Sequence, residues 1–124
     1  MKVVFDTNIL IDYLNGIKAA RNEISKYNIR QISVITYIEV MVGAKGPAEV
    51  EATQDFLRTF EMVELTASIA QETFALRQSL RLKIPDAIIY ATARTQDCLL
   101  VTRNTRDFKK DWADIRVPYQ APQM

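Results

Sequence analysis

Acidic residues stand where the strands of an α/β chain end and where its helices begin. Asp6 directly follows the apolar run Val3–Phe5, which is typical of a strand buried on both faces. Four acids placed in one partly desolvated cleft repel one another, and a bound cation relieves that repulsion. Oxygen ligands suit Mg²⁺ or Mn²⁺, which can activate a water for phosphodiester hydrolysis. The candidate metal ligands are Asp6, Glu39, Asp86 and Asp107.

Each acid also has a structural interpretation. Asp6 could cap a helix that begins near Asn8, and Thr36–Glu39 matches a capping box in which Glu39 bonds back to the Thr36 amide. Asp86 is suited to the first turn of a helix, and Asp107 to a turn. For each acid considered alone, the structural interpretation is favoured. Their shared position at one expected edge favours a metal site.

Three polar residues accompany the acids: Asn8, Thr102 and Asn104. Thr102 follows the strand Leu99–Val101, which should lie beside the first strand, so its hydroxyl is expected to orient Asp6. Turn and cap chemistry explains all three residues equally well. Basic residues flank these segments, and some could contact a phosphate backbone, although a solvated surface is favoured for any single one. They are Arg77, Arg81, Lys83, Arg94, Arg103, Arg106, Lys109 and Lys110.

Missing residue types exclude several kinds of chemistry. The chain has no histidine, which excludes Ser-His-Asp and Cys-His catalysis and nucleases that use two histidines. Cys98 is the single cysteine, so an intrachain disulfide is excluded and a structural zinc site is disfavoured. A buried thiol is expected there, and a lone thiol suits a reducing cytosol. None of the three glycines lies in a phosphate-cradling loop, and the net charge of +1 indicates no global basic surface.

Expected strands and helices alternate along the 124 residues. Strands are expected at 3–5, 31–35, 62–65, 99–101 and 116–117. Helices are expected near 8–14, 17–27, 38–43, 50–60, 69–80 and 86–96. This alternation predicts an α/β sandwich with a mainly parallel sheet and a ligand site beyond the carboxyl ends of its strands. The apolar run at the N-terminus is too short for a signal peptide or a membrane span, which favours a cytoplasmic protein with no membrane contact.

Four stretches together resemble the PIN-domain family. They are Val4-Phe5-Asp6-Thr7-Asn8, Thr36-Tyr37-Ile38-Glu39, Ile84-Pro85-Asp86-Ala87-Ile88-Ile89-Tyr90-Ala91-Thr92-Ala93 and Leu100-Val101-Thr102-Arg103-Asn104-Thr105-Arg106-Asp107-Phe108. The third stretch is the most specific. Order and spacing agree across nearly the whole chain, and a chain of this size is most similar to the VapC-type toxins of that family.

The resemblance implies a three-layer α/β/α fold with a mainly parallel sheet of four or five strands, over a single domain spanning residues 1–124. It implies an endoribonuclease that depends on Mg²⁺ or Mn²⁺, acts on RNA, forms a homodimer and is inhibited by a VapB-type antitoxin. Asp6, Glu39 and Asp86 carry over as catalytic metal ligands. The fourth acid occupies the position of Asn104 in some relatives and of Asp107 in others, so the acidic role falls to Asp107 here.

Three other functions compete with this one. A haloacid-dehalogenase-like phosphatase also places an aspartate after its first strand, but it needs a second acid where this chain has Asn8. A PIN-like module without activity could bind nucleic acid or protein, although the intact set of acids argues against it. A DNA nuclease is equally compatible with the residues, because 2′-hydroxyl contacts leave no sequence signature. The apolar faces within 17–27 and 50–60 could pack internally, or a second copy or an antitoxin helix could cover them.

Overall fold

Five parallel strands form one sheet in the computed structural model, which describes residues 1–121. The sheet order is β3-β2-β1-β4-β5, so β1 lies at its centre. Because all strand pairs are parallel, the carboxyl ends of the strands meet at the same edge of the sheet. The strands are β1 (Lys2–Phe5), β2 (Ile29–Ser33), β3 (Glu61–Val63), β4 (Leu99–Val101) and β5 (Ile115–Arg116).

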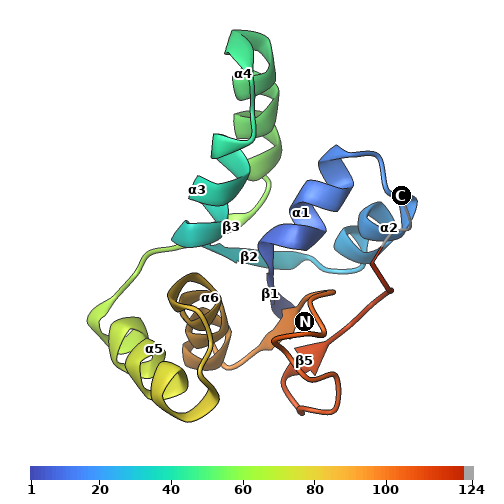
Figure 1. Ribbon diagram of the computed structural model, residues 1–124. Helices are drawn as coiled ribbons and strands as arrows, with labels where there is room; N and C mark the ends of the chain where they lie inside the picture. The colour runs from blue at the N-terminus through green and yellow to red at the C-terminus, as the bar shows by residue number, and fades with distance from the viewer. Residues whose placement is uncertain (122–124) are drawn as a thin grey trace.

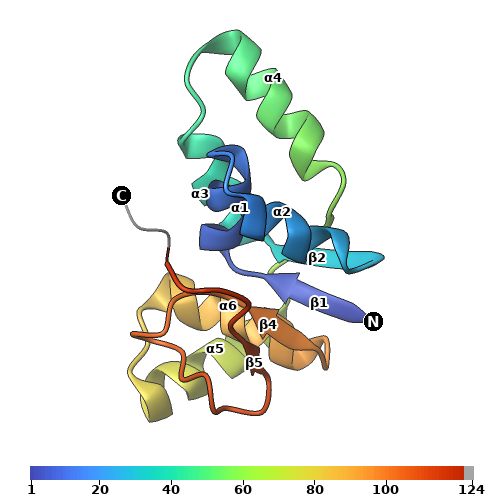
Figure 2. The same cartoon turned by 90° about the vertical axis from the view of Figure 1, so that its right-hand side faces the viewer.

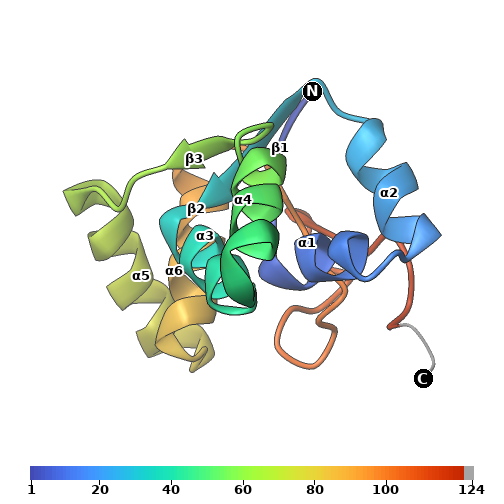
Figure 3. The ribbon, with the colours of Figure 1, turned by 90° about the horizontal axis from the view of Figure 1, so that it is seen from above.

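Helices cover both faces of the sheet, as Figures 1, 2 and 3 show. On one face lie α1 (Thr7–Leu14), α2 (Lys18–Ser25), α3 (Val34–Val42) and α4 (Gly46–Leu57). On the other lie α5 (Ala67–Leu80) and α6 (Ile84–Thr95). The three-layer α/β/α architecture is therefore confirmed, with a sheet that is fully rather than mainly parallel.

Each face of the sheet has its own apolar core. Phe5 and Ile32 pack with α1 to α4 on one side, while Val4, Leu100 and Tyr90 pack with α5 and α6 on the other. The apolar residues of 17–27 and 50–60 belong to the first core, because Ala20, Ile24, Leu57 and Phe60 are all buried there. Packing within the chain therefore accounts for these two faces.

The second strand ends two residues before the expected boundary. Val34 and Ile35 are β-branched and apolar, which favours a strand, but they form the first turn of α3. Ser33 is the N-cap, and its hydroxyl accepts a hydrogen bond from the Ile35 amide at 3.0 Å. Thr36 therefore lies inside the helix, and the predicted capping box between Thr36 and Glu39 is wrong.

Smaller differences concern the edge strands and Cys98. The strands β3 and β5 each begin one residue earlier than expected. The thiol of Cys98 is half-buried against the core rather than fully buried. Within residues 1–121, no helix combines the length and the apolar character that a membrane span requires. The single domain over 1–124 stays a prediction, and its last three residues lie outside the described range.

A buried ion pair fastens β5 to α2. The carboxylate of Glu23 is 2% exposed and accepts bonds from Arg116 Nε at 2.6 Å and Nη2 at 3.0 Å. The Tyr27 hydroxyl and the Lys26 ammonium contact the same carboxylate. Burial alone would raise the pKa of Glu23, but the hydrogen bonds from Arg116, Tyr27 and Lys26 outweigh it and lower that pKa.

Loss of the guanidinium should leave the buried Glu23 carboxylate without its main partner. We expect Arg116→Met to lower the free energy of unfolding by about 2 kcal/mol, measured by urea denaturation at pH 7. Arg58→Met is the matched control, because Arg58 pairs with Asp55 on the exposed surface, where such pairs contribute less than about 1 kcal/mol. Equal effects of the two substitutions would contradict a stabilising role for the buried pair.

Candidate active site

Asp6 lies at the carboxyl end of β1 and is almost completely buried, with 4% of the residue exposed. It is also the N-cap of α1, where its Oδ1 accepts a hydrogen bond from the Thr7 amide at 2.8 Å. Its Oδ2 accepts bonds from Thr102 Oγ1 at 2.7 Å and Asn8 Nδ2 at 3.2 Å. The predicted contact of Thr102 is confirmed, and the capping role of Asp6 coexists with a place in the acidic cluster.

The pKa of Asp6 shows that other acids lie nearby. Burial raises this pKa most, the bonds from Thr102 and the Thr7 amide lower it, and the charges of Asp86 and Glu39 raise it further, to about 6. A carboxyl group with such a pKa is largely ionised at pH 7, but its negative charge is less well stabilised than that of a free aspartate. A nearby positive charge would stabilise it.

Glu39 reaches the site from the second turn of α3, one turn later than expected. Thr7 Oγ1 donates a hydrogen bond to Glu39 Oε1 at 2.6 Å and lies 3.0 Å from Thr36 Oγ1. Thr7 therefore links β1's end to α3, with its amide on Asp6 and its hydroxyl on Glu39. The sequence alone gave Thr7 no role, although its position next to Asp6 in the first PIN-like stretch was the available signal.

Asp86 comes from the first turn of α6, on the opposite face of the sheet from α3. Burial raises the pKa of Asp86 most, and the charges of Asp107 and Glu39 raise it further, against a smaller lowering by Lys83. The four predicted acids therefore lie at one edge of the molecule, brought there by β1, α3, α6 and the loop after β4.

Asn104 and Asp107 act as a pair rather than as alternatives. Asn104 Nδ2 donates to Asp107 Oδ2 at 3.0 Å, and the Asp107 amide donates to Asn104 Oδ1 at 3.2 Å. The Asn104 amide in turn donates to Thr102 Oγ1 at 3.0 Å, and the Arg103 amide to Asn8 Oδ1 at 3.3 Å. This chain of bonds connects the fourth acid to the hydroxyl that holds Asp6.

An open cavity of about 590 Å³ lies beside the acids. Asn8, Asp86 and Asp107 line it together with three basic residues, Lys83, Arg103 and Arg106. The lining therefore combines carboxylates that can attract a cation with basic side chains that can contact phosphate oxygens.

The donor set fits a hard divalent cation that keeps part of its water shell. Within residues 1–121, no three acidic or cysteine side chains stand close enough to ligate one ion together. Mg²⁺ is usually held by one or two carboxylates and several waters, and all-carboxylate donors are the oxygen ligands that Mg²⁺ and Mn²⁺ prefer. The arrangement is compatible with such an ion through carboxylates and bridging waters.

Comparisons with known proteins identify several relatives of this chain. A toxin–antitoxin complex from Klebsiella pneumoniae contains a chain 41% identical to this one, with a TM-score of 0.91 over 97% of this chain and 100% of that chain. The tRNA(fMet)-specific endonuclease VapC of Shigella flexneri is 28% identical, over 89% of this chain and 92% of its own. Ribonuclease VapC10 of Mycobacterium tuberculosis is also 28% identical, over 97% and 95%.

The family comparison covers most of the chain and includes all four acids. The PIN domain family model matches residues 3–111. That span contains the sheet from β1 to β4 and the loop that carries Asn104 and Asp107. Given this match and the acidic edge that the fold assembles, the chain belongs to the PIN domain family.

Proposed function

We propose that this chain is a metal-dependent endoribonuclease and the toxin of a VapBC-type pair. The observation that carries this proposal is the buried carboxylate of Asp6, which shares its edge of the sheet with the charges of Glu39 and Asp86. Two relatives have ribonuclease names, and the Klebsiella neighbour comes from a toxin–antitoxin complex. A VapB-type antitoxin, a second copy of the chain and a cytoplasmic location complete the proposal.

The metal would be Mg²⁺ or Mn²⁺, and Asp6, Glu39, Asp86 and Asp107 would hold it, partly through bridging waters. When bound, such an ion supplies an activated water and stabilises the charge that develops on the phosphodiester. The electrostatics support this assignment. The charges of Glu39 and Asp86 raise the pKa of Asp6, and a cation bound among these carboxylates would offset their repulsion.

The chain itself orients the acids and receives the substrate. The hydroxyl of Thr102 and the amides of Thr7 and Asn8 keep the Asp6 carboxylate in one orientation. Thr7 does the same for Glu39, and Asn104 for Asp107. Lys83 and Arg106 line the cavity beside the acids, where they can contact the non-bridging oxygens of a phosphate.

The acidic edge also separates this proposal from its rivals. A dehalogenase-like phosphatase needs an acid at Asn8, whose amide instead donates to Asp6. An inactive binding module has no need to keep acids whose charges raise the pKa of Asp6 and of Asp86. A DNA nuclease would use the same residues, so the choice of nucleic acid is decided by assay.

Removal of one carboxylate should abolish cleavage without unfolding the chain. We expect Asp6→Asn and Asp86→Asn each to lower the rate of RNA cleavage about 10²- to 10⁴-fold. Cleavage of labelled RNA and of single-stranded DNA is measured with Mg²⁺, Mn²⁺ or EDTA, and circular dichroism checks the fold. EDTA should abolish wild-type activity. A wild type that binds RNA but never cleaves it with any divalent ion would support the binding module.

Asp6 should also make the stability of the metal-free protein depend on pH. Its raised pKa means that the folded state holds the proton more tightly than the unfolded chain does. The contribution favours folding below pH about 4, and it is lost as the pH rises through about 6. Between pH 4.5 and 7.5 we expect the free energy of unfolding to fall by about 2 kcal/mol more in the wild type than in Asp6→Asn. Urea denaturation in EDTA at pH 4.5 and 7.5 measures the difference, and parallel curves for the two proteins would contradict the prediction.

A further inference from the structure

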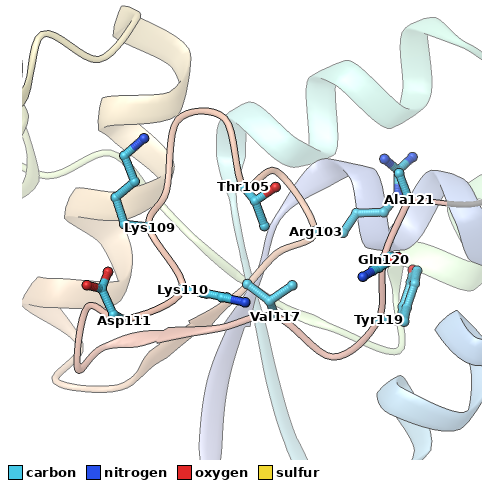
Figure 4. A pocket seen from close by; sticks show the side chains of 9 residues that line it. All are labelled: Arg103, Thr105, Lys109, Lys110, Asp111, Val117, Tyr119, Gln120 and Ala121. Carbon is cyan, nitrogen blue, oxygen red and sulfur yellow. The ribbon is translucent and has the colours of Figure 1, made fainter.

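A second and larger cavity opens beside the acidic site. It has a volume of about 1080 Å³ and lies between the loop that follows β4 and the segment 117–121. Figure 4 shows these two walls, with Thr105, Lys109 and Lys110 on the loop and Val117, Tyr119 and Gln120 on the segment. We call this cavity the C-terminal groove.

The C-terminal groove adjoins the cavity at Asp86 and Asp107. Arg103, Thr105 and Ala121 line both cavities, so these residues form the boundary that the two share. A ligand bound at Asp86 and Asp107 would therefore need to pass only these residues to reach the groove. A polymer would fit this shape better than a small molecule.

The charge of the groove favours an anionic ligand. Lys109 and Lys110 are exposed, and neither takes part in an ion pair within residues 1–121. Asp111 is the only acid in the lining. In a chain with a net charge of +1, this is a local concentration of cations next to the acidic site.

The wall of the groove is held by a buried carboxylate. Asp12 is 3% exposed and accepts bonds from Arg103 Nε at 2.5 Å and Nη2 at 3.0 Å. It also accepts a bond from the Tyr119 hydroxyl at 2.8 Å. Since Asp12 neutralises Arg103 and orients Tyr119, the groove presents an anchored aromatic ring and the ammonium groups of Lys109 and Lys110. The Lys109 ammonium also donates a hydrogen bond to the Arg106 carbonyl at 3.4 Å.

Cations beside an aromatic ring are the combination that binds single-stranded nucleic acid, with phosphates on the cations and a base on the ring. We propose that the C-terminal groove binds the RNA strand that flanks the scissile phosphodiester, with its phosphates on Lys109 and Lys110 and a base on Tyr119. This proposal rests on the proposed ribonuclease function. An acidic protein segment is the competing ligand, but the position of the groove directly beside the cavity at Asp86 and Asp107 favours the substrate.

Binding of RNA without cleavage tests the groove directly. The affinity of the full chain for a fluorescent single-stranded RNA is measured in EDTA by anisotropy, between 50 and 300 mM salt. We expect Lys109→Gln/Lys110→Gln to lower the slope of log K against log salt by about 1.4, the value for two lost phosphate contacts on a single strand. Lys18→Gln/Lys45→Gln is the control, because it removes the same charge from exposed positions outside the groove.

The aromatic contact is tested with a pair of variants. Tyr119→Leu should weaken RNA binding about 5-fold or more, whereas Tyr119→Phe keeps the ring and should retain most of the affinity. Circular dichroism and urea denaturation identify any loss through unfolding. Equal weakening by Leu and Phe would overturn the stacking role.

The outcomes separate the groove from the ribonuclease function. Equal salt slopes for the two lysine double variants would overturn the groove, while RNA cleavage by the wild type would leave the ribonuclease function intact. If Lys109→Gln/Lys110→Gln bound RNA as the wild type does but no longer bound poly-glutamate, the RNA proposal would be overturned in favour of an acidic protein segment. A reduced salt slope for Lys109→Gln/Lys110→Gln would support the groove. If the wild type also failed to cleave RNA, that second result would contradict the ribonuclease function alone.

Discussion

The candidate site depends on holding one carboxylate, that of Asp6, out of water at the end of the central strand. Burial and the charges of Glu39 and Asp86 oppose its ionisation, whereas Thr102 and the Thr7 amide favour it. These partners come from the neighbouring strand and from the helix that Asp6 itself caps. The order β2-β1-β4 is therefore what makes the site possible, because it places a hydroxyl on one side of Asp6 and α3 on the other.

The site is electrostatically unfavourable when no cation is present, and the rest of the molecule supports it. The pKa of Asp86 is raised as well, by burial and by the charges of Asp107 and Glu39. Stability comes from elsewhere: two apolar cores, and two buried carboxylates that are fully paired. Glu23 fastens β5 to α2 through Arg116, and Asp12 fastens the loop after β4 through Arg103. The carboxylates at the site therefore repel one another, whereas the buried carboxylates outside it are paired with arginines. This contrast is typical of functional sites.

The same loop has two functions in this arrangement. Its first residues, Thr102 and Asn104, orient Asp6 and Asp107. Its later residues, Lys109 and Lys110, line the C-terminal groove. Arg103 lies between them, lines both cavities and is held in place by Asp12.

Much of the architecture could be predicted from local patterns. The runs Val3–Phe5 and Leu99–Val101 are continuous and apolar, so their identity as buried strands was clear. The start of α3 could not be predicted in this way. Val34 and Ile35 favour a strand by residue type, whereas the Ser33 side chain caps a helix that begins at Val34. Two cap signals competed there, and only the observed backbone shows which one forms.

The sequence by itself determined the chemistry: carboxylates without histidine, placed after strands and at helix starts, and the family to which such an order belongs. The tertiary structure decided the partners. Which segments lie side by side decides the hydrogen bonds of Thr7 to Glu39 and of Asn104 to Asp107. It also decides the groove between residues 103–111 and 117–121. Hydrogen bonds such as Thr102 to Asp6 join residues 96 positions apart. Strand order and helix packing set such contacts, and local residue patterns do not encode them.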